Sequence, residues 1–432
     1  IKSEFSDLLL RVDQSVRIML MCATFLRPLA LHHLGIDMTE TTKFTAKTWV
    51  LILSLVLIAL TLRPSMASIG PLLPLMQPEL HLSFTQASLL TMLPVLAMGL
   101  GIFFAHQLAL WFGSYQLIFW ASIAIAAATA QRYWAVGALD LTLSAIVAGL
   151  GIAMVQAVVP GVIKQKFSTK APLVMGWYIS AIIAGAALTA SLAAFWADWA
   201  QSWRVALSGW VVLSVVALAL WFSQKNAIQN LPVVQSQQKP LSFRKYGRAW
   251  TLAMFFGLVT CAFTCVLAWL PAYYVEQGWS EQKSGLLLGL LLCMEVVSGF
   301  ISPWLASRKA DRRPMMLVLL VLMATGFAGL VAAPALGLVW ASLLGLGIGG
   351  LFPLSLIVSM DHQHQPSSAA SLTAFVQGIG YTLAAFSPLI AGFIRDFSQS
   401  FSISWLLLAT IAVLLMAMAT RFNPASYSKK FQ

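Results

Sequence analysis

Twelve apolar runs of about twenty residues each, separated by short polar joints, extend from Trp49 to Arg421. A run of that length suits an α-helix crossing about 30 Å of hydrocarbon. Because only a helix satisfies its own backbone donors and acceptors in lipid, each run predicts a membrane-spanning helix. The expected spans are 48–75, 86–110, 115–134, 138–163, 171–195, 203–223, 249–276, 282–305, 313–333, 335–360, 367–393 and 401–421.

The composition supports a polytopic membrane protein. Hydrophobic residues make up 59% of the chain and charged residues 9%, a balance outside the range of soluble domains. The net charge is +12, and the basic residues alternate with position along the chain. This pattern indicates membrane topology and not nucleic-acid binding. Four cysteines show no paired spacing, so neither a disulfide framework nor a metal site is expected.

The basic residues alternate between the two sides of the predicted membrane. One side holds Lys43, Lys47, Lys164, Lys166, Lys170, Lys225, Lys239, Arg244, Lys245, Arg248, Arg308, Lys309, Arg312, Arg313, Arg421, Lys429 and Lys430. The opposite joints hold only Arg132, Arg204, Lys283 and Arg395. The positive-inside rule therefore predicts a multi-pass membrane protein with both termini in the cytoplasm.

The chain divides into two related halves. Helix 4 carries the glycine-rich stretch from Gly149 to Pro160, and helix 10 carries a similar stretch from Gly345 to Pro353. We therefore expect an all-α membrane protein with twelve helices in two pseudo-symmetric six-helix halves. The expected parts are an N-terminal cytoplasmic segment (1–47), a first half (48–223), a cytoplasmic linker (224–248), a second half (249–421) and a tail (422–432).

Residues 1–37 are mixed apolar and basic, and two interpretations stay open. The stretch forms an amphipathic helix on the membrane surface, or it precedes a true start at Met38.

Arg63 is a charge in an apolar setting, about 24 Å along helix 1 from Lys47. Arginine at that depth costs about 2.5–3.5 kcal/mol on insertion scales and needs a partner or a watery cavity. Pro64 and Gly70 loosen the same helix, which suits a cavity wall. We expect Arg63 to hold an anionic or strongly polar solute; the alternatives are a structural ion pair or a side chain that reaches the surface.

Glu295 is a second charged residue within an apolar span, about 17–20 Å from the outer end of helix 8. A carboxyl group at that depth can carry a coupling proton. The alternatives are a permanent partner for Arg63 and a protonated packing group.

Amide and aromatic side chains complete the expected pocket. The candidates are Gln156, Trp177, Tyr178, Trp269, Tyr273, Gln377 and Tyr381. Each aromatic residue has an alternative as a packing or interfacial group, and each amide as a tie between helices. His362 and His364 are expected in a solvated joint between helices 10 and 11.

The sequence lacks the signature motifs of ATP-driven transporters and of several enzyme classes. There is no phosphate-binding loop of ATP-driven transporters and no zinc-protease, serine-hydrolase or cysteine-pair motif. We therefore expect no enzyme activity, no cofactor and no metal. A non-transporting receptor stays open as a different class, although no soluble signalling domain is present.

Several motifs resemble the cyanate/2-nitroimidazole transporter (CynX/NimT) family of the major facilitator superfamily, and the cyanate branch in particular. They cover about 45–425, and they are Leu62-Arg-Pro64, Ile69-Gly-Pro-Leu-Leu-Pro74, Ser88-Leu-Leu-Thr-Met-Leu-Pro94, Gln156-Ala-Val-Val-Pro160, Val162-Ile-Lys164, Pro172-Leu-Val-Met-Gly176, Leu267-Ala-Trp-Leu-Pro271, Asp311-Arg-Arg313, Gly349-Gly-Leu-Phe-Pro-Leu354 and Gln377-Gly-Ile-Gly-Tyr381.

The resemblance implies a secondary porter that moves a small polar or anionic solute, such as cyanate, by alternating access. It implies a monomer among the lipids of the cell inner (plasma) membrane. Its transport is expected to be proton-motive or otherwise secondary. The alternative is an exporter of small neutral heteroaromatics. The superfamily's charged gating loop is nearly erased between helices 2 and 3, whereas the copy between helices 8 and 9 keeps Arg308, Asp311, Arg312 and Arg313.

Overall fold

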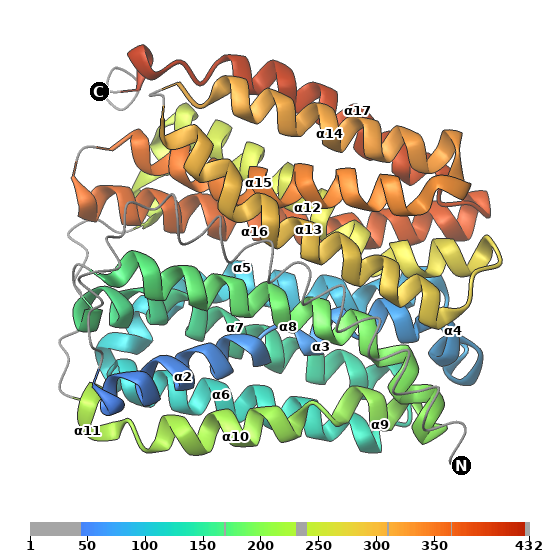
Figure 1. Cartoon of the computed structure of the whole chain (residues 1–432), viewed down its shortest axis with the longest axis horizontal. Helices are drawn as coiled ribbons and strands as arrows, with labels where there is room; N and C mark the ends of the chain where they lie inside the picture. The colour runs from blue at the N-terminus through green and yellow to red at the C-terminus, as the bar shows by residue number, and fades with distance from the viewer. Residues whose placement is uncertain (1–44, 168–169, 230–239, 309–310, 364, 428–432) are drawn as a thin grey trace. The chain divides into compact units, whose positions relative to one another are not determined.

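The computed structural model describes residues 45–167, 170–229, 240–308, 311–363 and 365–427, and these residues contain helices and no strand (Figure 1). The predictions for residues 1–37 and for a start at Met38 lie outside this part of the chain. The described residues from Leu51 onward belong to one compact unit, and residues 45–50 fall outside it. The division of the chain at 224–248 therefore stays a prediction.

The main helices follow the predicted order. Those before the linker are α2 (Ala46–Thr61), α3 (Pro64–Ala67), α4 (Ile69–Leu80), α5 (Phe84–Phe112), α6 (Ser114–Gln131), α7 (Ala138–Phe167), α8 (Ala171–Ala200), α9 (Trp203–Ser208) and α10 (Val211–Phe222). Those after it are α12 (Gly247–Glu276), α13 (Glu281–Ser307), α14 (Arg313–Ala332), α15 (Gly337–Asp361), α16 (Pro366–Ser398) and α17 (Ser402–Thr420).

Eleven spans among the described residues are long and apolar enough to cross a membrane. The one predicted span that is not among these eleven is the third, which corresponds to α6. This helix has 18 residues and carries Gln116 and Gln131 near its ends. These amides lower the hydropathy of a short helix, and α6 is not one of the eleven. It nevertheless packs along α7 and α10 in the place expected for the third span.

We name the two ends of the compact unit by its joints. The linker end holds α11 (Lys225–Ile228) and η4 (Pro240–Lys245), which flank the linker. The opposite end holds the joint between α4 and α5 and the joint between α16 and α17 (Figure 1).

The glycine-rich stretches repeat the same contact in the two halves. A Cβ atom on Gly149 of α7 would collide with the backbone of Pro94 in α5. A Cβ atom on Gly345 of α15 would collide with the carbonyl oxygen of Leu291 in α13. The fourth helix of each half thus packs tightly on the second helix of that half, as pseudo-symmetry requires.

The two most extensive helix contacts between the halves are α5 with α16 and α8 with α13. Both pairs approach closely because small residues lie at the contact: Gly99 faces Thr382 of α16, and Gly289 faces Ser191 of α8. Without the hydrophobic effect between helices in lipid, such close backbone packing is what holds the helices together.

Helix 1 is not continuous. The α2 helix ends at Thr61, and the short α3 begins at Pro64, which follows Arg63. Proline has no backbone N–H and its ring clashes with the preceding turn, so it breaks a helix at this position. The break places Arg63 at the N-cap of α3, with backbone angles of φ −106° and ψ −21°.

Candidate functional site

Arg63 is buried at the break, with 9% of its surface exposed. Its guanidinium carbon lies 5.6 Å from the centre of the Phe263 ring, and Nη1 lies 4.0 Å from the sulfur of Met66. No carboxylate among the described residues forms an ion pair with it. An aromatic face, a thioether and the Tyr381 side chain therefore surround the charge, and no described carboxylate neutralises it directly.

The Arg63 side chain lines a small pocket. The pocket lies where α3, α5, α12, α15 and α16 meet, so both halves contribute to its wall. The remaining lining residues are Val95, Met98, Thr260, Phe263, Thr264, Phe352 and Tyr381. One cation, three hydroxyl groups and otherwise apolar side chains thus enclose the space.

Three of the predicted site residues lie within electrostatic reach of Arg63. They are Tyr178 of α8, Glu295 of α13 and Tyr381 of α16. Two of these residues carry a buried oxygen with no hydrogen-bond partner among the described residues, namely Oη of Tyr178 and Oε1 of Glu295. Buried polar atoms are nearly always satisfied, so these two oxygens are candidates for contact with a polar solute or for holding a proton.

Glu295 is 4% exposed and lies where α13 meets α15. A Cβ atom on Gly349 would collide with the backbone of Glu295, so the two helices touch at this residue. The carboxylate forms no ion pair with Arg63 within 4 Å in the part of the chain that the structure describes. Glu295 therefore shares the electrostatic surroundings of Arg63 without neutralising it directly.

Trp269 and Tyr273 lie apart from the pocket lining. Trp269 donates from Nε1 to the carbonyl oxygen of Pro388 at 3.0 Å, and Tyr273 donates from Oη to that of Leu330 at 2.6 Å. Both rings pack against Phe401. Each polar atom is satisfied by backbone, so in this structure both side chains act as packing groups.

The two amides and Trp177 also fall outside the lining. Gln156 of α7, Trp177 of α8 and Gln377 of α16 are half-buried, and none of them contributes to the pocket wall. Their role in binding stays a prediction.

The sequence reasoning missed most of the apolar wall and both threonines. Thr260, Phe263 and Thr264 follow one another at helical spacing on α12, and Val95 and Met98 do so on α5. Two hydroxyls beside an aromatic ring at i, i+3 and i+4 spacing were a usable signal, because these positions share one helix face.

The predicted gating loop is paired within the second half. Arg313 forms an ion pair with Asp311 at 2.8 Å, and Arg312 with Asp361 at 3.4 Å. The Arg313 side chain holds the pKa of Asp311 below its usual range by hydrogen bonding. The guanidinium of Arg308 lies over the ring of Trp304 at 4.0 Å.

The prediction of a solvated His362 is wrong, because this side chain is 3% exposed. Its ring stacks on Tyr427 with centroids 3.8 Å apart. The chain after α17 folds back over the joint and covers it, an arrangement that local sequence does not reveal. His364 lies outside the described residues. Within the described residues, no group of histidine, cysteine or acidic side chains could hold a metal.

Comparisons with known proteins show the family of this chain. A model of the Major Facilitator Superfamily matches residues 55–385. The cyanate transport protein CynX of Escherichia coli is 36% identical over 87% of this chain and 98% of its own length. The 2-nitroimidazole transporter of the same organism is 31% identical over 86% of this chain and 93% of its own length.

Solved structures share the fold at low identity. The nucleoside transporter NupG superposes with a TM-score of 0.69 at 14% identity, covering 86% of this chain and 99% of its own. The partially occluded, inward-open xylose transporter XylE from E. coli superposes with a TM-score of 0.67 at 13% identity, covering 87% and 99%. At this identity the likeness shows the fold alone.

Proposed function

We propose that this chain, a member of the cyanate/2-nitroimidazole transporter family of the major facilitator superfamily, transports a small monovalent anion such as cyanate. Proteins of this family are transporters and not enzymes, and they work by alternating access between two halves. The identity to the cyanate transport protein favours the anion over other small solutes.

The observation that carries the proposal is the unpaired cation in the pocket. Arg63 is buried among apolar groups and forms no ion pair among the described residues, so an anion would gain the full attraction of its charge in a low-dielectric site. Its planar guanidinium presents several N–H donors in a fixed fork, which suits a small anion with two acceptor atoms. Thr260, Thr264 and Tyr381 add hydroxyl groups on other sides of the pocket.

The pocket walls also support a second candidate, a flat neutral heteroaromatic. The rings of Phe263 and Phe352 line the same space, and aromatic faces can stack on such a ring. The 2-nitroimidazole transporter is the relative that favours this alternative. The two candidates differ in whether the positive charge of Arg63 is required.

We also propose which residue couples transport to protons and which end of the protein faces the cytoplasm. Glu295, with its unpartnered oxygen near Arg63, would carry a coupling proton. The linker end carries Lys225, Arg244, Lys245, Arg248 and Arg308, so it would face the cytoplasm of an inner-membrane protein, together with both termini. The transporter would work as a monomer in the lipid.

We propose that the remaining predicted residues act in other states of the transport cycle. Gln156, Trp177 and Gln377 would meet the solute in another state of the cycle, since they are half-buried on helices that line the pocket or lie beside it. The paired Arg312–Asp361 contact would hold the linker end of α14 against α15 during that change.

Purified, reconstituted protein tests the proposal through uptake of radiolabelled cyanate and through ligand-induced thermal stabilisation. Binding to the folded state raises stability by mass action, and the shift is measurable for each solute of a panel. Arg63→Lys should weaken cyanate binding about tenfold or more, since it keeps the charge and loses the fork. Arg63→Ala should nearly abolish binding.

Arg204 supplies the control, because this half-buried arginine is paired with Glu79 at 2.6 Å and lies outside the pocket. Arg204→Lys should bind and transport as the parent protein does. Normal uptake by folded Arg63→Ala protein would refute the anion site. Stabilisation by 2-nitroimidazole in both Arg63→Ala and the parent protein would favour the heteroaromatic alternative.

A further inference from the structure

A second buried arginine lies in the first half, away from the pocket. Arg132, in the short turn η2 (Arg132–Trp134) after α6, is 1% exposed. The sequence pattern placed it among the basic residues of the joints opposite the linker. No carboxylate among the described residues forms an ion pair with it. A charge buried without a counter-ion is costly, so its hydrogen bonds must compensate.

The Arg132 side chain makes two hydrogen bonds that link three elements. Its Nε donates to Oγ of Ser144 in α7 at 3.0 Å, and its Nη1 donates to the carbonyl oxygen of Ser65 in α3 at 2.7 Å. Hydrogen bonds from a charged donor are stronger than those between neutral groups. The neighbouring residues Ala135 and Leu141 belong to an apolar cluster, which keeps water away from these bonds.

The Ser65 carbonyl belongs to the four-residue helix that follows the break in helix 1. Such a helix is too short to be stable by itself, because helix formation becomes favourable only over longer stretches. One side chain from outside the break holds it in place: Arg132 donates to the Ser65 carbonyl, two residues beyond Arg63. On the other side of the break, Gly185 lets α8 lie directly against the Leu60 carbonyl at the end of α2.

We infer that Arg132 is a positioning residue, which holds the break in helix 1 so that the guanidinium of Arg63 points into the pocket. Both partners of Arg132 lie in the first half, so the arrangement moves as one body with Arg63. Arg132 touches no pocket residue and acts only through the backbone of α3. That this position serves substrate binding rests on the function proposed above.

Hydrogen–deuterium exchange of the purified protein tests the positioning without any substrate. Arg132→Met removes both hydrogen bonds and the buried charge while keeping an apolar side chain of some length, so the variant should fold. Amides in peptides covering 62–70 should exchange about tenfold faster than in the parent protein. Arg132→Lys, which can still donate to the Ser65 carbonyl, should restore part of the protection.

Arg204→Met is the matched control. Arg204 lies at the same end of the first half and also donates to a backbone carbonyl, that of Ala135 at 2.8 Å. Its replacement should leave peptides 62–70 unchanged. Unchanged exchange in Arg132→Met would overturn the inference, and so would an equal increase across all peptides of the first half, which would indicate general destabilisation.

Cyanate binding tests the link to Arg63. The dissociation constant should rise about tenfold in Arg132→Met, and the effect should be much smaller in an Arg63→Lys background, because residues that act through one another are not additive. Full additivity would overturn the link. If the parent protein binds no cyanate while exchange of 62–70 still responds to Arg132, the proposed function fails and the positioning stands.

Discussion

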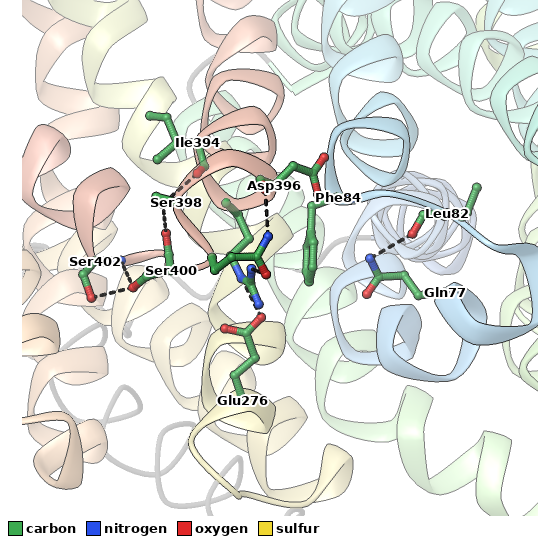
Figure 2. A network of polar contacts seen from close by, with 11 residues as sticks. Gln77, Leu82, Phe84, Glu276, Ile394, Asp396, Ser398, Ser400 and Ser402 are labelled. Atoms are coloured by element: carbon green, nitrogen blue, oxygen red, sulfur yellow. Dashed lines mark hydrogen bonds and ion pairs between the residues drawn. The ribbon is translucent and has the colours of Figure 1, made fainter.

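The carboxylate of Asp396 in α16 caps the first turn of α5, which belongs to the other half of the protein. It accepts hydrogen bonds from the backbone N–H of Phe84 at 3.0 Å and of Thr85 at 2.8 Å, and from the Thr85 hydroxyl. Figure 2 shows Asp396 beside Phe84 at this contact. The first N–H groups of a helix have no partner within it, so a carboxylate from outside is favourable there.

A second contact lies beside the first one. Arg395 forms an ion pair with Glu276 of α12 at 2.9 Å and lies over the Phe84 ring at 4.8 Å. The two halves are therefore joined by charged groups at the opposite end, which is the end away from the linker. The Arg395–Glu276 ion pair lies within the second half, whereas the contacts of Asp396 with Phe84 and Thr85 and of Arg395 with the Phe84 ring cross between the halves. Alternating access requires these crossing contacts to break when that end opens.

Asp396→Asn should favour the state that is open at the opposite end. The amide keeps one acceptor but loses the charge, and a charge at a helix N-terminus contributes about 0.3–1 kcal/mol, up to ~2 kcal/mol when partly buried. Electron–electron distances between spin labels at the exposed positions Tyr133 and Phe397 should lengthen. Asp198→Asn, an exposed carboxylate on α8, is the control and should change nothing; an unchanged distance distribution in Asp396→Asn would refute the gate.

Glu295→Gln should separate binding from coupling. Glutamine imitates the protonated carboxyl group in shape, so cyanate affinity should change less than about threefold. Accumulation driven by a pH gradient should disappear in proteoliposomes, whereas exchange of labelled for unlabelled substrate should persist. Accumulation against a gradient at the parent level would show that Glu295 carries no coupling proton.

The double variant Arg63→Ala with Glu295→Gln tests the alternative of a structural ion pair. Removal of one partner of a buried pair leaves an uncompensated charge, and removal of both does not. Among the described residues, no ion pair joins these two side chains within 4 Å. The change in unfolding free energy of the double variant should therefore equal the sum of the changes in the two single variants. A double variant that is more stable than either single one would indicate direct pairing.

Gly185→Ala should destabilise the protein, because the added Cβ would collide with the carbonyl oxygen of Leu60 at the break in helix 1. Overpacking of this kind costs about 1–3 kcal/mol. Gly161→Ala is the control: no atom lies within 4 Å of its Cβ, and alanine is favoured over glycine in a helix by up to about 1 kcal/mol. Thermal unfolding in detergent should show a lower midpoint for the first variant only, and equal midpoints would contradict the packing at Leu60.

His362 should make stability depend on pH. Arg248 donates from Nε to Nε2 of this ring at 3.0 Å, so Nδ1 carries the proton that binds the Val358 carbonyl at 2.6 Å, and the ring is neutral. Burial, with the nearby Arg248 charge, lowers the pKa of His362 to about 4. The unfolded chain has a pKa of about 6.5 and binds the proton first.

Stability should therefore be complete above about pH 6.5 and fall as the pH drops toward 4, since the unfolded state takes up more protons there. Each unit of difference is worth about 1.4 kcal/mol. Unfolding midpoints measured between pH 7.5 and 4.5 should fall more steeply for the parent protein than for His362→Gln. The exposed His81→Asn serves as control, and equal slopes for the parent protein and His362→Gln would contradict the prediction.

The sequence by itself determined the helices, their order and the presence of a charge at Arg63 and another at Glu295. These follow from local properties, because hydropathy over about twenty residues and the cost of a charge in lipid do not depend on what packs nearby. The resemblance to a transporter family also rested on short motifs, and the comparisons confirmed it.

Only the tertiary structure decided which side chains surround Arg63. Trp269 satisfies its N–H on the Pro388 carbonyl, whereas Thr264 reaches the pocket wall, and helical spacing alone does not separate the two. The sequence placed Arg132 in a joint, and only the structure shows that it is buried against the Ser65 carbonyl. The reason is physical: burial and hydrogen-bond partners depend on contacts between helices far apart in the chain, and local composition carries no record of those contacts.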